Sequence, residues 1–498
     1  MAESIVTVAN ETAAEDISFG RQLTLRAVSD PNGVALTVVR RDGSEISLTS
    51  AALECASNQW GRTLAENSLT AGGRVVLALP NSVEVVLATL ACWKVGAIPI
   101  PMRWDLPHWE RERLLEVIEP TLVIDEVNCA TYAQAAAHQS HDPLPDVVSP
   151  AINGICSSGS TGLPKIILTD HRALFTPRHK EPFITHWVEV PRPQTILVPG
   201  PMYHTNGFNA LNYLLGGDRL VILEKFDASV VLDTIETHQI STFTATPTML
   251  SRIADIPEVD QRDLSSIQWI LQGAAVMPET LLRRWFELLS PEKIVMAYGM
   301  TENLGLTALR GDDWLDHPGS VGRGFRDTEI RILDDRGKPV PAGDLGEVYM
   351  RAPMTDGYRY LGGAAPLPTT TEGFTSAGDM GYLDADGYLY IVDRRTDMIV
   401  TGGANVFPAE VESALIDHES VADVVVIGLS DPKWGRRVHA VVQPTDTADP
   451  PSEQAVIEYA KRKLAGYKVP KTVEFVDQIP RTAATKVNRS AMARARCG

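Results

Sequence analysis

Short apolar runs alternate with stretches of helical spacing through the first half of the chain. RVVLALP (74–80) predicts a buried strand, SVEVVLATLACWKVG (82–96) a helix, and TLVIDEV (121–127) another strand. The alternation recurs with the strands TILVPGPM (195–202), RLVILEKF (219–226) and STFTATP (241–247), the helical TMLSRIADI (248–256), and the strand IQWILQGAA (267–275). Strands that alternate with helices predict layered parallel sheets covered by helices, the α/β class.

The pattern changes after about Gly319. Short apolar strands joined by Gly and Asp turns predict an antiparallel or β-barrel-like subdomain. The expected strands are SVGRG (320–324), TEIRILDD (328–335), GEVYMRAP (346–353) and GYLYIVDRR (387–395). Helical and strand patterns then mix in a small α+β unit. We place the boundary near Asp397, which predicts a large N-terminal domain (1–396) and a small, mobile C-terminal domain (397–498).

Composition narrows the class of protein. A chain of 498 residues predicts two or more domains, and a net charge of −18 argues against nucleic acid or an anionic membrane as the main partner. The five scattered cysteines predict reduced thiols rather than disulfides or a CxxC metal site. The acidic N-terminus has no signal core, and the longest apolar stretch (83–100) contains Glu84, Lys94 and Pro99. We therefore expect a cytoplasmic protein, either a monomer or a homodimer.

The loop SSGSTGLPK (157–165) is rich in hydrogen-bond donors. It lacks the GxxxxGK[ST] pattern of P-loop NTPases, because Lys165 follows proline and precedes Ile166. Hydroxyl groups and glycine amides exposed in one turn can form an anion-binding nest. By composition alone, a simple Ser/Gly turn between strands is an equally good reading.

Seven motifs in order favour phosphate binding, because together they resemble the adenylate-forming superfamily of acyl-CoA ligases, peptide-synthetase adenylation domains and luciferases. They are SGSTGLPK (158–165), PMYH (201–204), YGMTE (298–302), SAGD (376–379), DR (393–394) with Asp397, GGANVFP (402–408) and RTAATK (481–486). The resemblance implies that a carboxylate attacks the α-phosphate of ATP to give acyl-AMP and pyrophosphate, and that a nucleophile then takes the acyl group. The rival classes are a non-catalytic nucleotide sensor, which would be expected to lose Glu302 or Lys486, and a P-loop hydrolase.

The resemblance also implies residue roles, which suit a reaction that needs positioning and positive charge. It places Glu302 on Mg²⁺, Asp379 on the ribose hydroxyls, and Arg394 on the ribose or phosphate. The phosphates would contact Ser158, Gly159, Ser160, Thr161, Gly162 and Lys165. The adenine side would be formed by Gly273, Ala274, Ala275, Tyr298, Gly299 and Thr301.

The remaining implied roles concern catalysis and transfer. Lys486 would bridge the attacking carboxylate and the α-phosphate, and His204 would act where the acyl site meets the nucleotide. Asp397 would be the hinge on which the C-terminal domain rotates, so that Gly402 and Gly403 face the incoming acceptor. The acyl pocket would draw on Asn206, Gly207, Gln272, Met300 and Asn303, which suits an aromatic or ring-containing acid.

The acceptor is left open between two nucleophiles. CoA is the preferred co-substrate, which makes the protein an acyl-CoA or aryl-CoA ligase, and the alternative is an amide bond synthetase that uses a free amine. The sequence departs from the common family pattern at Ile166, at Thr485 before the lysine, and at Arg436, where a glutamate is common. Arg436 either binds an anionic CoA phosphate or is a surface residue.

Overall fold

The computed structural model describes residues 17–157, 165–176, 181–352, 357–395, 397–481 and 487–496. The chain forms two compact units, each described by itself: unit 1 comprises residues 1–155 and 168–226, and unit 2 comprises residues 156–167 and 227–498. Strands β7 (Gly154–Ser157) and β8 (Lys165–Thr169) lie where the chain passes between these ranges. The predicted division at residue 397 stays a prediction.

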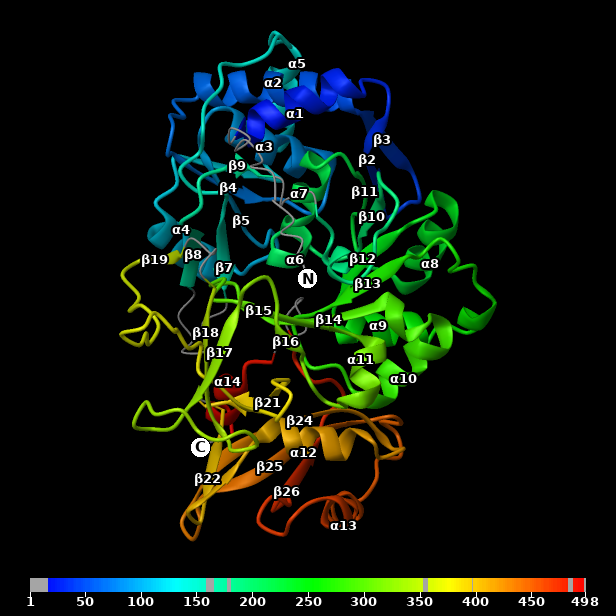
Figure 1. The fold of residues 1–498 in the computed structure, drawn as a ribbon, viewed down its shortest axis with the longest axis vertical. Coiled ribbons are helices and arrows are strands. Elements are labelled where there is room, and N and C mark those ends of the chain that lie inside the picture. The colour runs from blue at the N-terminus through cyan, green and yellow to red at the C-terminus, as the bar shows by residue number, and fades with distance from the viewer. Residues whose placement is uncertain are drawn as a thin grey trace, which may run out of the picture. The chain divides into compact units, whose positions relative to one another are not determined.

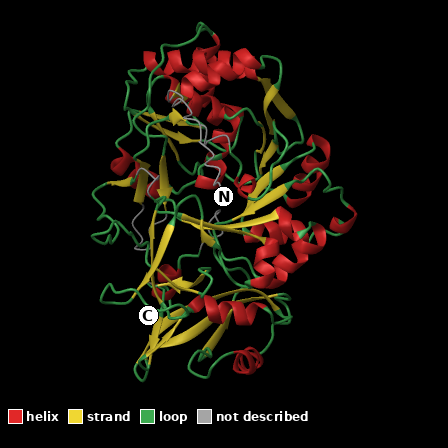
Figure 2. Ribbon diagram, in the orientation of Figure 1, coloured by secondary structure: helices red, strands yellow, loops and turns green. Residues whose placement is uncertain are grey.

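Unit 1 contains the first α/β layers (Figures 1 and 2). Strands β4, β5 and β6 form a parallel sheet in the order β5-β4-β6, while β10, β11 and β2 are parallel and β3 is antiparallel to β2. The strands are β1 (Ile17–Ser18), β2 (Val34–Val39), β3 (Glu45–Thr49), β4 (Arg74–Ala78), β5 (Ile98–Pro101), β6 (Leu122–Asp125), β9 (Leu174–Phe175), β10 (Thr195–Val198) and β11 (Arg219–Leu223). The helices are α1 (Phe19–Ser29), α2 (Ser50–Glu66), α3 (Val83–Lys94), α4 (His108–Ile118), α5 (Cys129–Ala137), α6 (Thr205–Phe208), α7 (Ala210–Leu215) and the 3₁₀ helix η2 (Phe183–His186). The predicted strands β4, β6, β10 and β11 and the predicted helix α3 are confirmed.

Helix α3 is the central helix of unit 1. Ser82 caps its N-terminus by accepting from the amide of Val85, and almost every residue of the helix is buried because its apolar side chains cover all faces. The Trp93 ring packs edge-on against Phe19 of α1 at 4.8 Å and Phe208 of α6 at 5.9 Å. Helices α1, α2 and α3 therefore share one core at the top of Figure 1.

A charged pair, Lys94 and Glu54, is buried in this core. The ammonium of Lys94 lies 2.8 Å from both carboxylate oxygens of Glu54 and from the Oδ1 atom of Asn58, both on α2. Glu54 also accepts from Thr24 and from the Asn58 amide. Burial lowers the pKa of Lys94, and Glu54 opposes that effect. Every donor of the ammonium has an acceptor, as a buried charge requires.

Unit 2 begins with a run of parallel strands. Strands β12, β13 and β14 are parallel, β15 and β16 continue antiparallel, and helices α8, α9 and α10 gather beside them (Figure 1). The strands are β12 (Thr242–Ala245), β13 (Trp269–Gln272), β14 (Ile294–Gly299), β15 (Leu306–Arg310) and β16 (Arg323–Gly324). The helices are α8 (Ala228–His238), α9 (Pro247–Ala254), α10 (Glu279–Leu288), α11 (Gly311–Asp316) and the 3₁₀ helices η3 (Val259–Gln261) and η4 (Pro291–Lys293). The predictions of β12, β13 and α9 are confirmed.

The antiparallel prediction after Gly319 is confirmed with one correction. An antiparallel sheet has the order β17-β18-β20-β21, and its neighbours are antiparallel throughout. The strands of this region are β17 (Glu329–Leu333), β18 (Gly346–Arg351), β19 (Tyr358–Leu361), β20 (Asp379–Leu383) and β21 (Leu389–Arg394). The strand expected over 320–324 is shortened to β16, because Gly322 turns the backbone at φ +97° and makes only an isolated bridge to Leu389.

The segment after Asp397 is a mixed α+β structure, as predicted (Figure 2). Its strands run β23-β22-β25-β24, and β26 pairs with β25. The elements are β22 (Ile399–Thr401), β23 (Ala404–Val406), β24 (Val421–Asp431), β25 (Gly435–Pro444), β26 (Thr472–Phe475), α12 (Pro408–Ile416), α13 (Glu453–Lys463) and α14 (Arg489–Arg494).

Alternate residues of β24 face different helices. Val424 and Val426 share a cluster with residues of α12 and α13, whereas Val425 and Ile427 share another with Met492 of α14. This packing anchors the chain just after Lys486. Within the part of the chain that the structure describes, no helix has the length and apolar character needed to cross a membrane.

Candidate nucleotide and acyl-transfer site

Two predicted segments follow the neighbouring parallel strands β13 and β14. Gln272 of β13 pairs in parallel register with Met296 of β14, so the residues that follow both strands meet at the carboxyl ends of the strands, where α/β proteins bind ligands. Gly273, Ala274 and Ala275 follow β13, and the turn from Met300 to Asn303 follows β14. The structure thus brings the predicted adenine segments together.

The turn after β13 is held by its own side chain. The amide of Gln272, which is 3% exposed, donates to the carbonyl of Ala275 at 2.6 Å. Ala274 has a φ of +73°, a conformation unfavourable for residues other than glycine. Gln272, predicted in the acyl pocket, thus has a clear structural role in shaping this turn.

The turn after β14 carries Thr301 and the predicted metal ligand Glu302. The Asn303 amide donates to the carbonyl of Met300 at 2.9 Å, and Asn303 has a φ of +53°. Met300, Thr301 and Glu302 are half-buried, whereas Gly299 and Asn303 are exposed. These side chains can therefore face a ligand.

Two predicted ribose-side residues, Asp379 and Arg394, form one cluster with Tyr298, which was predicted on the adenine side. The hydroxyl of Tyr298 donates to Oδ2 of Asp379 at 2.6 Å, and Nε of Arg394 lies 3.2 Å from Oδ1 of the same carboxylate. Asp379 and Arg394 meet because they are paired residues of β20 and β21. Burial, followed by the charge of Asp379, raises the pKa of Tyr298 well above its usual value, so the phenol remains a donor. The buried carboxylate is held from both sides.

Tyr360, which lies in none of the seven motifs, connects two predicted residues. Its hydroxyl donates to Oε1 of Glu302 at 2.8 Å, and Nζ of Lys165 lies 4.8 Å from the centroid of its ring. Burial, followed by the bond to Glu302, raises the pKa of Tyr360 well above its usual value. The alternation of Tyr358 and Tyr360 in GYRYLG places both on one face of a strand, but nothing in the sequence names their partners.

The donor set suits magnesium bound together with a nucleotide. No group of three or more His, Cys, Asp or Glu side chains that could hold a metal occurs in the described ranges, so a cage made wholly of protein is not found there. Mg²⁺ is commonly held by one or two carboxylates, substrate phosphates and water. Glu302 provides one such carboxylate and fits this mode.

His204 and its neighbours belong to unit 1. His204 precedes α6 in an extended conformation, and its ring lies 4.6 Å from that of Tyr203. Asn206 is exposed, whereas Gly207 is buried. A Cβ atom at Gly207 would lie 2.4 Å from the carbonyl oxygen of Pro201, so close packing accounts for this glycine.

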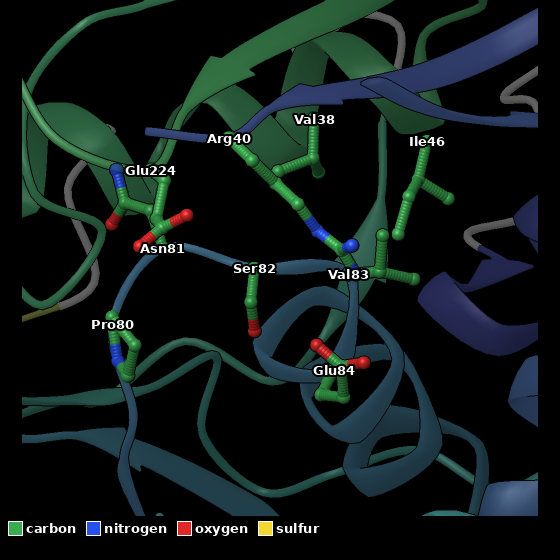
Figure 3. Close-up of a pocket in the computed structure, with 9 residues that line it drawn as sticks. All are labelled: Val38, Arg40, Ile46, Pro80, Asn81, Ser82, Val83, Glu84 and Glu224. Carbon is green, nitrogen blue, oxygen red and sulfur yellow. The ribbon is translucent and has the colours of Figure 1, made fainter. Parts of the chain in front are cut away.

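Asn81 is another residue that sequence reasoning missed. Its amide donates to the carbonyls of Gly200 and Leu223 at 2.9 Å, and its oxygen accepts from the amide of Met202 at 2.8 Å. It therefore fixes the segment just before His204. Asn81 also lines a pocket of about 100 Å³ beside Arg40 and the start of α3, and no predicted site residue lines this pocket (Figure 3).

The predicted acceptor channel lies at the β22–β23 turn. Gly402 has a φ of +56°, and a Cβ atom there would lie 2.8 Å from the Trp434 ring, so only glycine fits without displacement. The Gly402 amide donates to the carbonyl of Trp434 at 2.9 Å. The indole is 40% exposed, and the ammonium groups of Lys433 and Lys471 lie 5.0 and 5.8 Å from its ring. Gly403 is also exposed.

The predicted hinge residue is part of an ionic cluster. Arg489 contacts Asp397 at 3.2 Å and Glu412 of α12 at 2.6 Å. Burial raises the pKa of neighbouring Asp393 to about 6.

Arg436 is exposed and donates to the carbonyl of Gly428 at 3.1 Å, which fits the interpretation of Arg436 as a surface residue.

Six predicted residues lie outside the described residues: Ser158, Gly159, Ser160, Thr161, Gly162 and Lys486. Their roles stay predictions.

Two family models match the chain. The model of the AMP-binding enzyme matches residues 24–359, and that of the AMP-binding enzyme C-terminal domain matches residues 410–486. Feruloyl-CoA synthase of an Amycolatopsis species is 31% identical over 470 residues, which cover 91% of this chain and 94% of the relative.

Solved structures agree with the family models. The o-succinylbenzoate CoA synthetase of Bacillus subtilis in complex with its acyl-adenylate intermediate has a TM-score of 0.81 and 27% identity, covering 97% of this chain and 100% of that chain. The same synthetase in complex with ATP and magnesium ion has a TM-score of 0.79 and 26% identity, covering 94% and 98%. The resemblance inferred from the seven motifs is confirmed: the chain belongs to the AMP-binding enzyme family, the adenylate-forming ligases.

Proposed function

We propose that this ligase activates an aromatic or ring-containing carboxylic acid with ATP and transfers the acyl group to the thiol of CoA. The relatives support this acceptor over a free amine, because those described above are CoA synthases or synthetases. Their names also specify aromatic acyl groups, in agreement with the acid class expected from the amide-containing segments. The amide bond synthetase is an outcome of the test below.

The first half-reaction joins two anions. A carboxylate oxygen of the acid bonds to the α-phosphorus of ATP, and the bond to pyrophosphate breaks. Asp379 would accept from both ribose hydroxyls, while Lys165 and Lys486 would supply positive charge around the phosphates. Glu302 would hold Mg²⁺, which neutralises phosphate charge when it is bound.

The second half-reaction exchanges AMP for the thiol. The CoA sulfur bonds to the acyl carbon, the bond from that carbon to the AMP oxygen breaks, and the thiol proton is lost to solvent. Gly402 and Gly403 would let the thin pantetheine arm pass close to the backbone.

The single observation that carries the CoA assignment is the exposed Trp434 indole beside Gly402. An exposed aromatic ring offers a stacking surface to a nucleotide base, and Lys433 and Lys471 offer positive charge to phosphates. A simple amine has neither a nucleobase to stack on the indole nor a phosphate to pair with the lysines. These groups therefore favour an acceptor that contains a nucleotide.

The deciding experiment supplies ATP, Mg²⁺ and a panel of aryl and aliphatic acids, with CoA or with simple amines. Pyrophosphate release and product mass are followed. A thioester formed with CoA supports the proposal. An amide formed without CoA identifies an amide bond synthetase, and steady phosphate release without pyrophosphate would contradict adenylation altogether.

Replacing Asp379 with asparagine is expected to raise the KM for ATP about tenfold, because the neutral amide accepts more weakly from the ribose hydroxyls. The KM for ATP is measured by pyrophosphate exchange. Asp335→Asn is the control, since this exposed carboxylate pairs with Arg395. An equal change in both variants would contradict the ribose role.

Replacing Trp434 with alanine is expected to raise the KM for CoA about tenfold, because stacking of a base contributes about 1–3 kcal/mol. Acyl-AMP formation, measured as pyrophosphate exchange, should be unchanged. Trp109→Ala removes another exposed indole and serves as the control. If the KM for CoA is unaltered, Trp434 does not contact the acceptor.

A further inference from the structure

We propose that Tyr360 is a positioning residue that orients the Glu302 carboxylate for the divalent cation and the Lys165 ammonium for the phosphates. This inference rests on the proposed function and deepens it. It concerns a residue that none of the seven motifs contains. Its basis is the contact of one side chain with two predicted ligand-binding residues.

The hydroxyl of Tyr360 fixes one oxygen of the Glu302 carboxylate. The donor–acceptor distance to Oε1 is 2.8 Å, and the two residues are 58 positions apart in the chain. Among the residues that the structure describes, none donates a hydrogen bond to Oε2 of Glu302 or forms an ion pair with it. A carboxylate held through one oxygen presents the other in a restricted set of directions, which suits a cation with strict octahedral geometry.

The ring of Tyr360 faces the Lys165 ammonium. The 4.8 Å distance from Nζ to the ring centroid lies within the range of cation–π attraction. Lys165 begins β8, immediately after the glycine-rich loop. The aromatic ring can therefore restrain a long, flexible side chain without adding a negative charge that would compete with phosphate.

Tyr360 itself is restrained by its strand. It lies in β19, and the ring of Tyr358, two residues earlier on the same face, meets it edge-on at 5.0 Å. Tyr358 uses its own hydroxyl to accept from the amide of Leu367 at 2.9 Å. The neighbouring tyrosine thus braces the loop after β19, and Tyr360 is the one that contacts Glu302.

The test measures cation binding without turnover. Manganese replaces magnesium, and free Mn²⁺ is followed by electron paramagnetic resonance in the presence of α,β-methylene-ATP, which cannot release pyrophosphate. Tyr360→Phe keeps the ring and removes the hydroxyl, and we expect the Kd for Mn²⁺ to rise about tenfold. Tyr360→Leu removes the ring as well, and we expect it also to weaken binding of the analogue measured in the absence of Mn²⁺.

The controls separate positioning from folding. Tyr349→Phe removes a hydroxyl on β18 and should leave Mn²⁺ affinity unchanged, and thermal unfolding checks that each variant is folded. In the Glu302→Gln background the Tyr360→Phe change should have no further effect on Mn²⁺ affinity, because its effect acts through the carboxylate. This double variant distinguishes an effect through Glu302 from a general loosening of the site.

The outcomes are distinct. A Kd for Mn²⁺ within twofold of wild type in Tyr360→Phe, or unchanged Mn²⁺ binding in Glu302→Gln, would overturn the inference. The Mn²⁺ Kd values of wild type and the variants could follow the expected order while the wild-type protein releases no pyrophosphate with any acid. That result would contradict the proposed function and support the role of Tyr360. If Tyr360→Phe does not fold, a Mn²⁺ Kd for Tyr360→Leu equal to wild type contradicts the inference, and a raised one supports it.

Discussion

Lys486→Ala is expected to lower the rate of acyl-AMP formation by about 10²–10³-fold, because it removes positive charge from the site where charge develops on the α-phosphate. Thioester formation from supplied acyl-AMP should keep most of its rate, since that step breaks no phosphoanhydride bond. The ends of the segment that carries this lysine are anchored. Arg481 pairs with Asp423 at 2.6 Å, and Arg489 pairs with Glu412.

The two half-reactions are measured separately, by pyrophosphate exchange and by thioester formation from synthetic acyl-AMP. Lys461→Ala is the matched control, because this lysine is about half exposed on α13 and pairs with Glu458. Equal losses in both half-reactions would contradict the assignment of Lys486 to adenylation alone, and with it the predicted rotation at Asp397.

Lys94→Met is expected to lower the free energy of unfolding by about 3–5 kcal/mol, because it leaves the buried Glu54 carboxylate without its cation. Methionine fills a similar volume, so loss of packing contributes little. Urea unfolding followed by circular dichroism measures the change at neutral pH.

Two companion variants test the cause of that loss. Glu54→Gln combined with Lys94→Met should recover much of the stability, because no unpaired buried charge remains. Lys461→Met, at an exposed pair, should change the free energy of unfolding by less than about 1 kcal/mol. A double variant as unstable as Lys94→Met alone would show that packing, rather than charge, causes the loss.

The predicted elements were correct where the apolar pattern was strong. Helix α3 and strand β4 are apolar along almost their whole length, so both must be buried in a core. The apolar pattern alone therefore identified them. The strand expected at 320–324 was mostly wrong, because a positive φ at Gly322 interrupts pairing. A glycine in an apolar run gives little indication of its backbone conformation.

In the candidate site, too, some features were predicted from the sequence and others were shown only by the structure. Asp379, Arg394 and Tyr298 were named from motifs, and the structure brings them together through the pairing of β20 with β21 and the bond from Tyr298. Gln272 was named for the acyl pocket, yet its amide supports the turn at Ala275. A motif identifies a residue type at a position but does not say which neighbour uses its hydrogen bonds.

The sequence alone determined the α/β class, the family and the identity of most candidate ligand-binding residues. Local spacing and ordered motifs carry that information, because helix and strand periodicity and the chemistry of each side chain are properties of short segments. Only the tertiary structure decided that Lys94 has a complete set of acceptors, that Trp434 is exposed beside Gly402, and that Tyr360 joins Glu302 to Lys165. These contacts join segments far apart in the chain, and they depend on how strands and helices pack, which no local pattern specifies.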